Sequence, residues 1–349
     1  MVQWTYPGSV EPEEEHEIAP GEKVVVGLFR PEDGPGIARL FRAVYGDAYP
    51  VKRFYDPGEM VQAHESGENY SITARKPGGD VVGHMAIFRS SPFPNLYEAG
   101  AGLVLSHYRK AGINKLLLTH LYDRVIPAIG VDAVWGEAVC NHTIMQKTVQ
   151  GHGHVETGLE VDLMPSEAYE QEKSASGRVA SVLCFRAYRH RPHRIYFPSC
   201  YEAELHFLYQ ALDDERTLEP SGETLPTGVV THGECQTFEF AGVSRIMVKE
   251  IGSDFEGWLG SLEKELLRRP ARVVQSWLNL ACPWVGHAVS VLRGRGYFLG
   301  GVLPRWFDED AILMQKIIGI PDWAGIHLFS DRACRILELV RTDWESTLP

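Results

Sequence analysis

The sequence predicts an α/β protein in which strands and helices alternate along both halves of the chain. Apolar runs of strand length, such as 24–29 and 131–139, are separated by stretches whose apolar residues recur at helical spacing. A Pro-Gly-Gly-Asp turn at 77–80 joins two such runs into a β-hairpin. The 349 residues are enough for two domains.

Composition excludes several classes of protein. With 44% hydrophobic and 23% charged residues, the chain is typical of a soluble globular protein. No apolar run approaches membrane-spanning length, and we expect no signal peptide because residues 1–5 lack a basic start and an apolar core. The formal net charge of −12 argues against a nucleic-acid binder. The six cysteines are scattered, without a Cys-x-x-Cys pair, so we expect reduced thiols in a cytoplasmic protein and no zinc site.

The elements of the first half follow a definite order. An acidic arm, rich in Glu and Pro, is expected at 1–22. We then expect a strand at 24–29, helices at 36–44 and 57–66, strands at 70–75, 81–88 and 97–105, a helix from 113, a strand at 131–139, a helix at 141–150, and strands at 154–163 and 179–188. The order is therefore β-α-α-β-β-β-α-β-α-β-β.

The most informative stretch is the strand, turn and helix at 103–118. Its strand leads into a basic turn that contains Arg109, Lys110 and Gly112, and apolar residues then keep helical spacing. The first-turn amides of a helix have no partner inside the helix, so they attract anions. A pyrophosphate fits such amides and the two cationic side chains. An ordinary strand, turn and helix with a glycine at the bend has the same pattern.

The spacing of Val104, Arg109 and Gly112 resembles the pyrophosphate-binding motif of the GNAT acetyltransferase superfamily. That motif runs Arg or Gln, two residues, Gly, one residue, Gly or Ala, and Asn114 departs from it. The element order over 23–190 is also the GNAT order. The resemblance implies a mixed, mostly antiparallel central sheet flanked by helices, with acetyl-CoA as cofactor. The residues that would hold coenzyme A are Leu103, Val104, Leu105, Arg109, Lys110, Ala111, Gly112, Ile113, Asn114 and Lys115.

Two positions after the strand at 131–139 extend the comparison with GNAT enzymes. Asn141 matches a position where these enzymes often place an Asn that contacts the pantetheine arm. Seven residues later they often carry a Tyr that protonates the leaving thiolate, and Thr148 stands there instead. Since Thr is too weak an acid, a water, another side chain or no dedicated acid would serve.

The resemblance implies acetyl transfer from acetyl-CoA to an amine by direct attack, which requires a base. The candidates are Glu137, a charged residue inside an apolar strand, and Glu98 on the preceding strand, with His84 and His142 as alternatives. Each has a structural role as its alternative, and a carboxylate could instead bind the ammonium group of the substrate.

Three residues are candidates for contact with the acceptor. Tyr45 and Tyr49 lie on the loop that usually covers the acceptor in this family, and His84 lies on the third strand. The two tyrosines could equally pack as surface aromatics under that loop. The acceptor itself could be a small-molecule amine or a protein lysine.

The second half resembles a degenerate copy of the first, which predicts two tandem domains at 23–190 and 191–349. Residues 251–255 stand where a second basic turn would be, but they contain no Arg, and Asp254 would repel a phosphate. This half is therefore not expected to bind coenzyme A in the usual way. It could close over the acceptor, form a homodimer surface or bind a regulator.

Alternatives remain open for the chain and for one local motif. The chain could be a non-catalytic sensor or regulatory protein that binds coenzyme A, or a scaffold without a cofactor. Neither nucleic acid nor a membrane is an expected partner. His190 and His193 sit three residues apart among arginines, which favours a solvated linker over a metal site.

Overall fold

The computed structural model describes residues 13–47, 49, 51–169, 177–222, 224–266, 268 and 271–348. The chain forms two compact units, unit 1 (Met1–Gly136) and unit 2 (Glu137–Pro349), and we describe each by itself. This division differs from the expected domains at 23–190 and 191–349, which stay a prediction. Among the described residues, no helix combines the length and the hydropathy that crossing a membrane requires.

Unit 1 is built on a mainly antiparallel set of strands. Their spatial order is β1-β2-β3-β4-β5-β6, and only β5 and β6 run parallel. The strands are β1 (Glu13–Ala19), β2 (Glu22–Leu28), β3 (Asn69–Arg75), β4 (Val81–Arg89), β5 (Leu96–Val104) and β6 (Ala133–Val139), of which β6 continues into unit 2.

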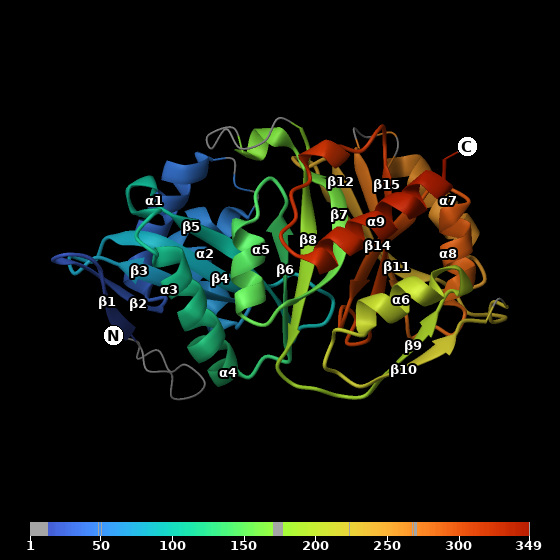
Figure 1. Cartoon of the computed structure of the whole chain (residues 1–349), viewed down its shortest axis with the longest axis horizontal. Coiled ribbons are helices and arrows are strands. Elements are labelled where there is room, and N and C mark those ends of the chain that lie inside the picture. Colours follow the sequence, from blue (N-terminus) through green and yellow to red (C-terminus); the bar gives the residue numbers. More distant parts are fainter. Residues whose placement is uncertain are drawn as a thin grey trace. The chain divides into compact units, whose positions relative to one another are not determined.

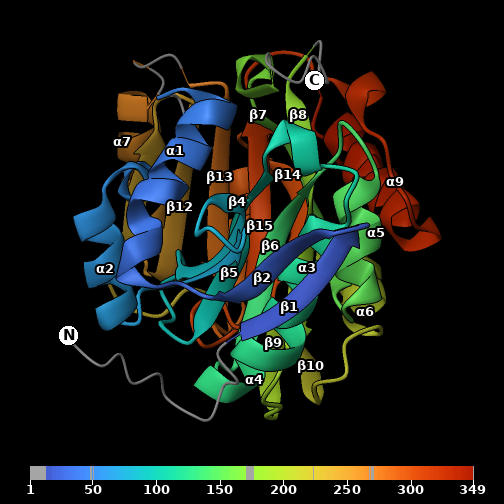
Figure 2. The same cartoon turned by 90° about the vertical axis from the view of Figure 1, so that its left-hand side faces the viewer.

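Helices cover both faces of the strands of unit 1 (Figure 2). They are α1 (Gly34–Tyr45), α2 (Pro57–Glu65), α3 (Ile113–His120) and α4 (Ile126–Ile129). Successive side chains of β4 point to opposite faces. His84 packs against Phe41 of α1, whereas a Cβ on Gly83 would come within 2.9 Å of Ile113 on α3. Glycine at position 83 therefore lets α3 lie close to the strand.

The described part of the acidic arm forms β1. Its acidic side chains pair with basic residues of the same unit: Glu13 lies 3.0 Å from the guanidinium of Arg75, and Glu14 lies 3.3 Å from that of Arg124. Arg75 also donates to buried Asp33 at 2.6 Å. Charge pairing thus holds the arm as an edge strand, while residues 1–12 lie outside the described residues.

Unit 2 contains a second set of strands, in the spatial order β8-β7-β14-β15-β13-β12-β11. Only β12 and β13 run parallel. The strands are β7 (Val155–Met164), β8 (Val179–Ala187), β11 (His232–Phe238), β12 (Val243–Glu250), β13 (Val273–Asn279), β14 (Phe298–Leu303) and β15 (Ala311–Ile317). A separate parallel pair consists of β9 (His193–Phe197) and β10 (Arg216–Pro220).

The described helices of unit 2 are α5 (Ile144–Gly151), α6 (Glu202–Tyr209), α7 (Phe255–Leu266), α8 (Val285–Arg293) and α9 (Asp331–Ser346). Helices α6 and α9 pack on β7 and β14, as Figure 1 shows. The core of unit 2 includes buried apolar residues from β7, β8, β12, β13, β14 and the helices. The unit therefore has a sheet covered by amphipathic helices, as the periodicity predicted.

The structure confirms the order of strands and helices that the sequence predicted from β2 to β8, with the short helix α4 in addition. It also shows that the order β12, α7, β13, α8, β14, β15 repeats the order β5, α3, β6, α5, β7, β8, each with one parallel strand pair. The tandem of two domains stays a prediction. The prediction of a solvated linker was wrong for residues 193–197, because His193, Ile195 and Phe197 are buried on strand β9.

A chain of buried hydrogen bonds runs through unit 1 from α2 to β5. The amide of Ser71 donates to Nε2 of His64 at 2.7 Å, so Nδ1 of His64 carries the proton that the Met60 carbonyl accepts at 2.7 Å. The Ser71 hydroxyl lies 2.8 Å from Nε2 of His84, and Nδ1 of His84 donates to the Ala101 carbonyl at 2.8 Å. Because Nε2 of His64 accepts from an amide, this imidazole is neutral. Burial lowers the pKa of each histidine to about 4.

From these two buried histidines we predict that the protein loses stability in mild acid. In the unfolded chain the two histidines take up protons below pH 6.5, whereas in the folded chain they do so only near pH 4. The contribution of the two neutral histidines to the free energy of unfolding is thus present above pH 6.5 and is lost as the pH falls toward 4. We expect a loss of about 2 kcal/mol per histidine between pH 7 and pH 5, measured by urea unfolding. His64→Gln should flatten this dependence, and an unchanged slope would contradict the assignment.

Candidate functional site

The candidate anion site of unit 1 is the turn between β5 and α3. After β5, a short 3₁₀ turn (Ser106–Tyr108) leads to Gly112, which is the N-cap of α3 and has a φ of 75°. This left-handed conformation is strained for any residue with a Cβ, so glycine is required by the backbone. No side-chain oxygen caps the helix. The first-turn amides of α3 are therefore directed toward whatever lies in front of the turn.

The turn presents its charges outward. Arg109, Lys110 and Lys115 are exposed, and a Cβ built on Gly112 would meet no atom within 4 Å. Ile113 is fully buried and anchors the helix in the core. The remaining predicted residues of the turn, Ala111 and Asn114, are partly buried. An anion placed before the helix would thus face the backbone amides and the cationic side chains together.

The hydrogen-bond pattern of β5 separates the three strand residues predicted to face the cofactor. The amide of Leu105 donates to the Val82 carbonyl at 3.0 Å, and Leu103 is paired with His84. Because the backbone amides and carbonyls of successive residues in a strand point to opposite edges, those of Val104 point away from β4. The guanidinium of Arg109 lies 3.4 Å from the Val104 carbonyl. Val104 is therefore the residue whose backbone faces the outer edge, whereas Leu103 and Leu105 pair with β4.

That outer edge is mostly without a ladder in the described part of the chain. The parallel pairing of β5 with β6 runs only from Leu96, opposite Ala133, to Glu98, opposite Trp135. Strand β5 continues to Val104. In the described residues the strand therefore continues six residues past its pairing with β6, and on this side the Val104 carbonyl accepts from Arg109.

A β-bulge interrupts β5 before the turn. Ala101 and Gly102 lie opposite the single residue Met85, and Ala101 has a φ of 55°. A Cβ on Gly102 would come within 2.5 Å of the Met85 side chain. The Ala101 carbonyl accepts the hydrogen bond from His84 described above. His84 therefore supports the strained conformation of the bulge.

The structure places His84, which was predicted to contact a substrate, in the interior of unit 1. The side chain is fully buried, and both ring nitrogens already have partners. Through its hydrogen bond to the Ala101 carbonyl, His84 instead helps to position β5.

The other predicted residues of unit 1 lie on the face of the sheet that α1 covers. Tyr45 and Tyr49 are partly buried, with ring centroids 5.0 Å apart, and they pack against the core around Phe41. Glu98 is paired in register with Phe88, which belongs to the same cluster. The structure thus brings these two tyrosines and the Glu98 carboxylate to one face of unit 1.

Glu137 lies in unit 2 within a network of buried polar groups. Its carboxylate oxygen is 3.3 Å from the guanidinium of Arg245, which also lies 3.2 Å from Glu160. Gln275 accepts from Nε of Arg245 at 2.9 Å and donates to Glu160 at 2.6 Å. Sequence reasoning missed these three partners. The signal that singled out Glu137, a charged residue inside an apolar strand, is also present at Glu160 and Arg245.

Asn141 and His142 precede α5 in unit 2. The helix begins at Ile144, three residues after the predicted start at Asn141. Both residues are partly buried, and the carbonyl of His142 accepts from Gln146 at 3.3 Å. The hydroxyl of Thr148 donates to the Ile144 carbonyl at 2.8 Å. This bond occupies the proton of Thr148, in agreement with the expectation that Thr148 is not an acid.

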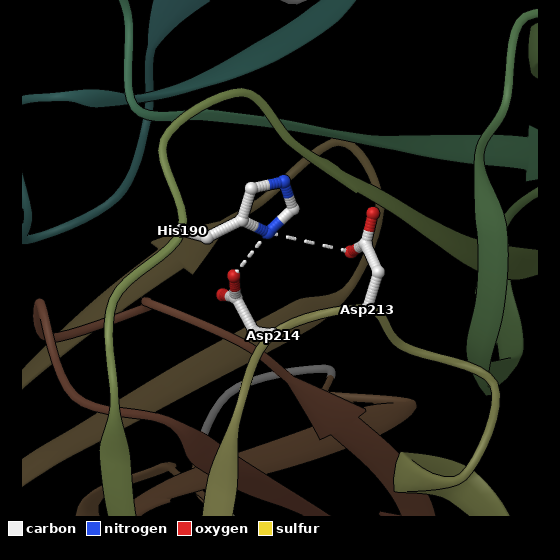
Figure 3. A group of neighbouring side chains, drawn as sticks. All are labelled: His190, Asp213 and Asp214. Carbon is white, nitrogen blue, oxygen red and sulfur yellow. Dashed lines mark hydrogen bonds and ion pairs between the residues drawn. The ribbon is translucent and has the colours of Figure 1, made fainter.

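His190 is part of a cluster of ionisable groups in unit 2, drawn in Figure 3. Its Nδ1 lies 2.6 Å from Asp214 and 3.7 Å from Asp213. The same Asp214 lies 3.4 Å from buried His193 and 3.5 Å from Arg216. Burial alone would raise the pKa of Asp214, but His193 and Arg216 hold it below its usual value. Because Asp214 already faces a guanidinium, a metal cation would be repelled there.

Comparisons with known proteins complete this description. No model of a protein family matches the sequence, and no curated protein matches it either. Among solved structures, the ribosomal-protein-S5-alanine acetyltransferase of Vibrio fischeri is 14% identical, with 51% of this chain and 97% of that chain covered and a TM-score of 0.40. The ribosomal-protein-S18-alanine N-acetyltransferase of Escherichia coli is 15% identical, with 48% of this chain and 96% of that chain covered and a TM-score of 0.37.

A third solved structure is a mutant form of the spermidine/spermine N-acetyltransferase SpeG of Vibrio cholerae. It is 10% identical, covers 47% of this chain and 94% of its own, and has a TM-score of 0.37. At such identities and TM-scores no activity is transferred from these proteins to this chain.

Proposed function

We propose that the chain is an N-acetyltransferase that transfers an acetyl group from acetyl-CoA to an amine by direct attack. One observation carries the proposal. A turn with exposed Arg109 and Lys110 joins β5 to the uncapped N-terminus of α3, and in the described residues β6 pairs with the outer edge of β5 only as far as Glu98. A pyrophosphate next to an extended, amide-rich arm is the ligand that matches both features.

Each part of acetyl-CoA has a matching group in unit 1. The pyrophosphate would accept from the first-turn amides of α3 and from Arg109. The pantetheine arm would pair with the outward backbone of Val104. A strand amide on this edge would stabilise the oxyanion that forms when the amine attacks the thioester.

For the base we propose Glu137, with Glu98 and His142 as the alternatives. A carboxylate that is partly exposed and held by a guanidinium can take a proton from an ammonium group directly or through a water. Tyr45 and Tyr49 would contact the acceptor, which is an amine of a small molecule or a protein lysine. Since the proton of Thr148 is engaged, a water or another side chain would protonate the leaving thiolate.

The second half of the chain is proposed not to bind coenzyme A through its equivalent turn. Helix α7 begins directly after Asp254, and the Asp254 carboxylate accepts from the amide of Thr231 at 2.8 Å. Hydrogen bonds from Thr231 lower the pKa of Asp254, so the carboxylate is ionised at neutral pH. A phosphate at this helix N-terminus would meet a negative charge instead of Arg109 and Lys110.

Arg109→Ala should weaken the binding of acetyl-CoA by about 1.5–3 kcal/mol, the range for a hydrogen bond to a charged group. Isothermal titration calorimetry of the full chain measures this change. Arg39→Ala, which removes an exposed arginine of α1 in the same unit, is the matched control and should leave the affinity unchanged. Equal affinities for wild type and Arg109→Ala would contradict the assignment of the turn.

Glu137→Gln should lower kcat by about 10²- to 10⁴-fold, the usual contribution of a general base, without changing acetyl-CoA affinity. Release of free thiol in the presence of a panel of amines measures turnover. Glu98→Gln is the parallel variant: a loss of turnover there alone would assign the base to Glu98. If the wild type binds acetyl-CoA without turnover, this would instead support the alternative hypothesis of a non-catalytic sensor that binds coenzyme A.

A further inference from the structure

The network around Glu137 joins residues that are far apart in the chain. Arg245 is 108 residues from Glu137 and 85 from Glu160, and all three belong to unit 2. One terminal nitrogen of Arg245 faces both carboxyl groups, at 3.3 and 3.2 Å. Its Nε donates to Gln275. One guanidinium from β12 therefore connects the end of β6 with β7 and β13.

Aromatic rings hold this guanidinium in place. Arg245 lies 5.6 Å from the ring centre of Phe238, 5.7 Å from that of Trp306 and 5.9 Å from that of Trp277. Its side chain is only 8% exposed. Rings at this distance attract a cation and restrict the rotamers of the arginine. The position of the charge is thus set by the second half of the chain.

The two carboxyl groups differ in their access to solvent. The side chain of Glu160 is 0% exposed, whereas that of Glu137 is 25% exposed. One guanidinium balances one negative charge, and two carboxylates at one site cannot both ionise readily. Burial, and then the neighbouring Glu137, raise the pKa of Glu160 well above its usual value. Burial therefore favours the neutral acid at Glu160, and of the two groups Glu137 is the one that is partly exposed to solvent.

We propose that Arg245 and Glu160 are positioning residues for Glu137, through which the second half of the chain holds the base of the acetyl transfer. This inference rests on the proposed function, with Glu137 as base. Arg245 fixes the Glu137 carboxylate through a charged hydrogen bond. Glu160, a neutral acid bound to Gln275, supports the guanidinium without competing for its charge.

Replacing Arg245 tests the first part. Arg245→Met should lower kcat between about 10- and 100-fold, a part of what a general base contributes, while KM for acetyl-CoA changes less than about twofold. Arg245→Lys should recover some of the loss, because it keeps the charge but not the planar fork. Arg295→Met is the matched control: Arg295 also belongs to unit 2, but it pairs with Glu263 at 2.9 Å. That variant should keep the wild-type kcat, and thermal unfolding shows that each variant is folded.

Replacing Glu160 tests the second part. Glu160→Ala should lower kcat, and Glu160→Gln should recover most of it, because a neutral amide replaces a neutral acid. Infrared difference spectra of the free proteins supply a readout without substrate. At pH 7 the wild type should show the carbonyl stretch of a protonated carboxyl group that Glu160→Gln lacks.

The outcomes separate the inference from the proposed function. An unchanged kcat in Arg245→Met, or the absence of the protonated-carboxyl band, overturns the inference while the enzyme remains an acetyltransferase. A wild type that binds acetyl-CoA but acetylates no amine contradicts the proposed function instead, and with it the role of Glu137 as base.

Discussion

The unequal hydrogen bonding of the two edges of β5 is the constraint on which the candidate site depends. One edge pairs with β4 to the end of the strand, and the other pairs with β6 only as far as Glu98. Backbone amides and carbonyls need partners, so an edge without a ladder pairs with water or with a ligand. The bulge at Ala101 decides which residues face which edge, because a shift of one residue reverses every direction. Through that bulge, buried His84 influences how Val104 is presented.

The same topology carries opposite charges in the two halves of the chain. In both halves a strand leads into a helix and then into a parallel strand. The first connection presents Arg109 and Lys110, whereas the second presents Asp254 at the start of α7. The fold alone therefore does not make a phosphate site. In the described residues, the two connections differ in the charge of the turn: the first has exposed cations, whereas the second has a carboxylate.

Buried charge in unit 2 points to a role beyond stability. A guanidinium that is almost fully buried costs several kcal/mol in lost hydration, and apolar residues of similar size would often serve the fold as well. Arg245 is nevertheless buried among three aromatic rings and faces two carboxyl groups. Such an arrangement defines the position and protonation of carboxyl groups, which is what proton transfer requires.

The sequence by itself determined the features that depend on neighbouring residues. Periodicity predicted the order from β2 to β8, because burial of one face imposes its spacing on each element. The glycine and the cations of the turn at 109–112 are readable for the same reason. Tertiary structure alone decided which edge of β5 is open, that His84 is buried under the bulge, and that residues 193–197 are a strand. It alone brought Arg245 to Glu137 and Glu160, because side chains 85 to 108 residues apart meet only when strand order and register are set, and no local pattern encodes either.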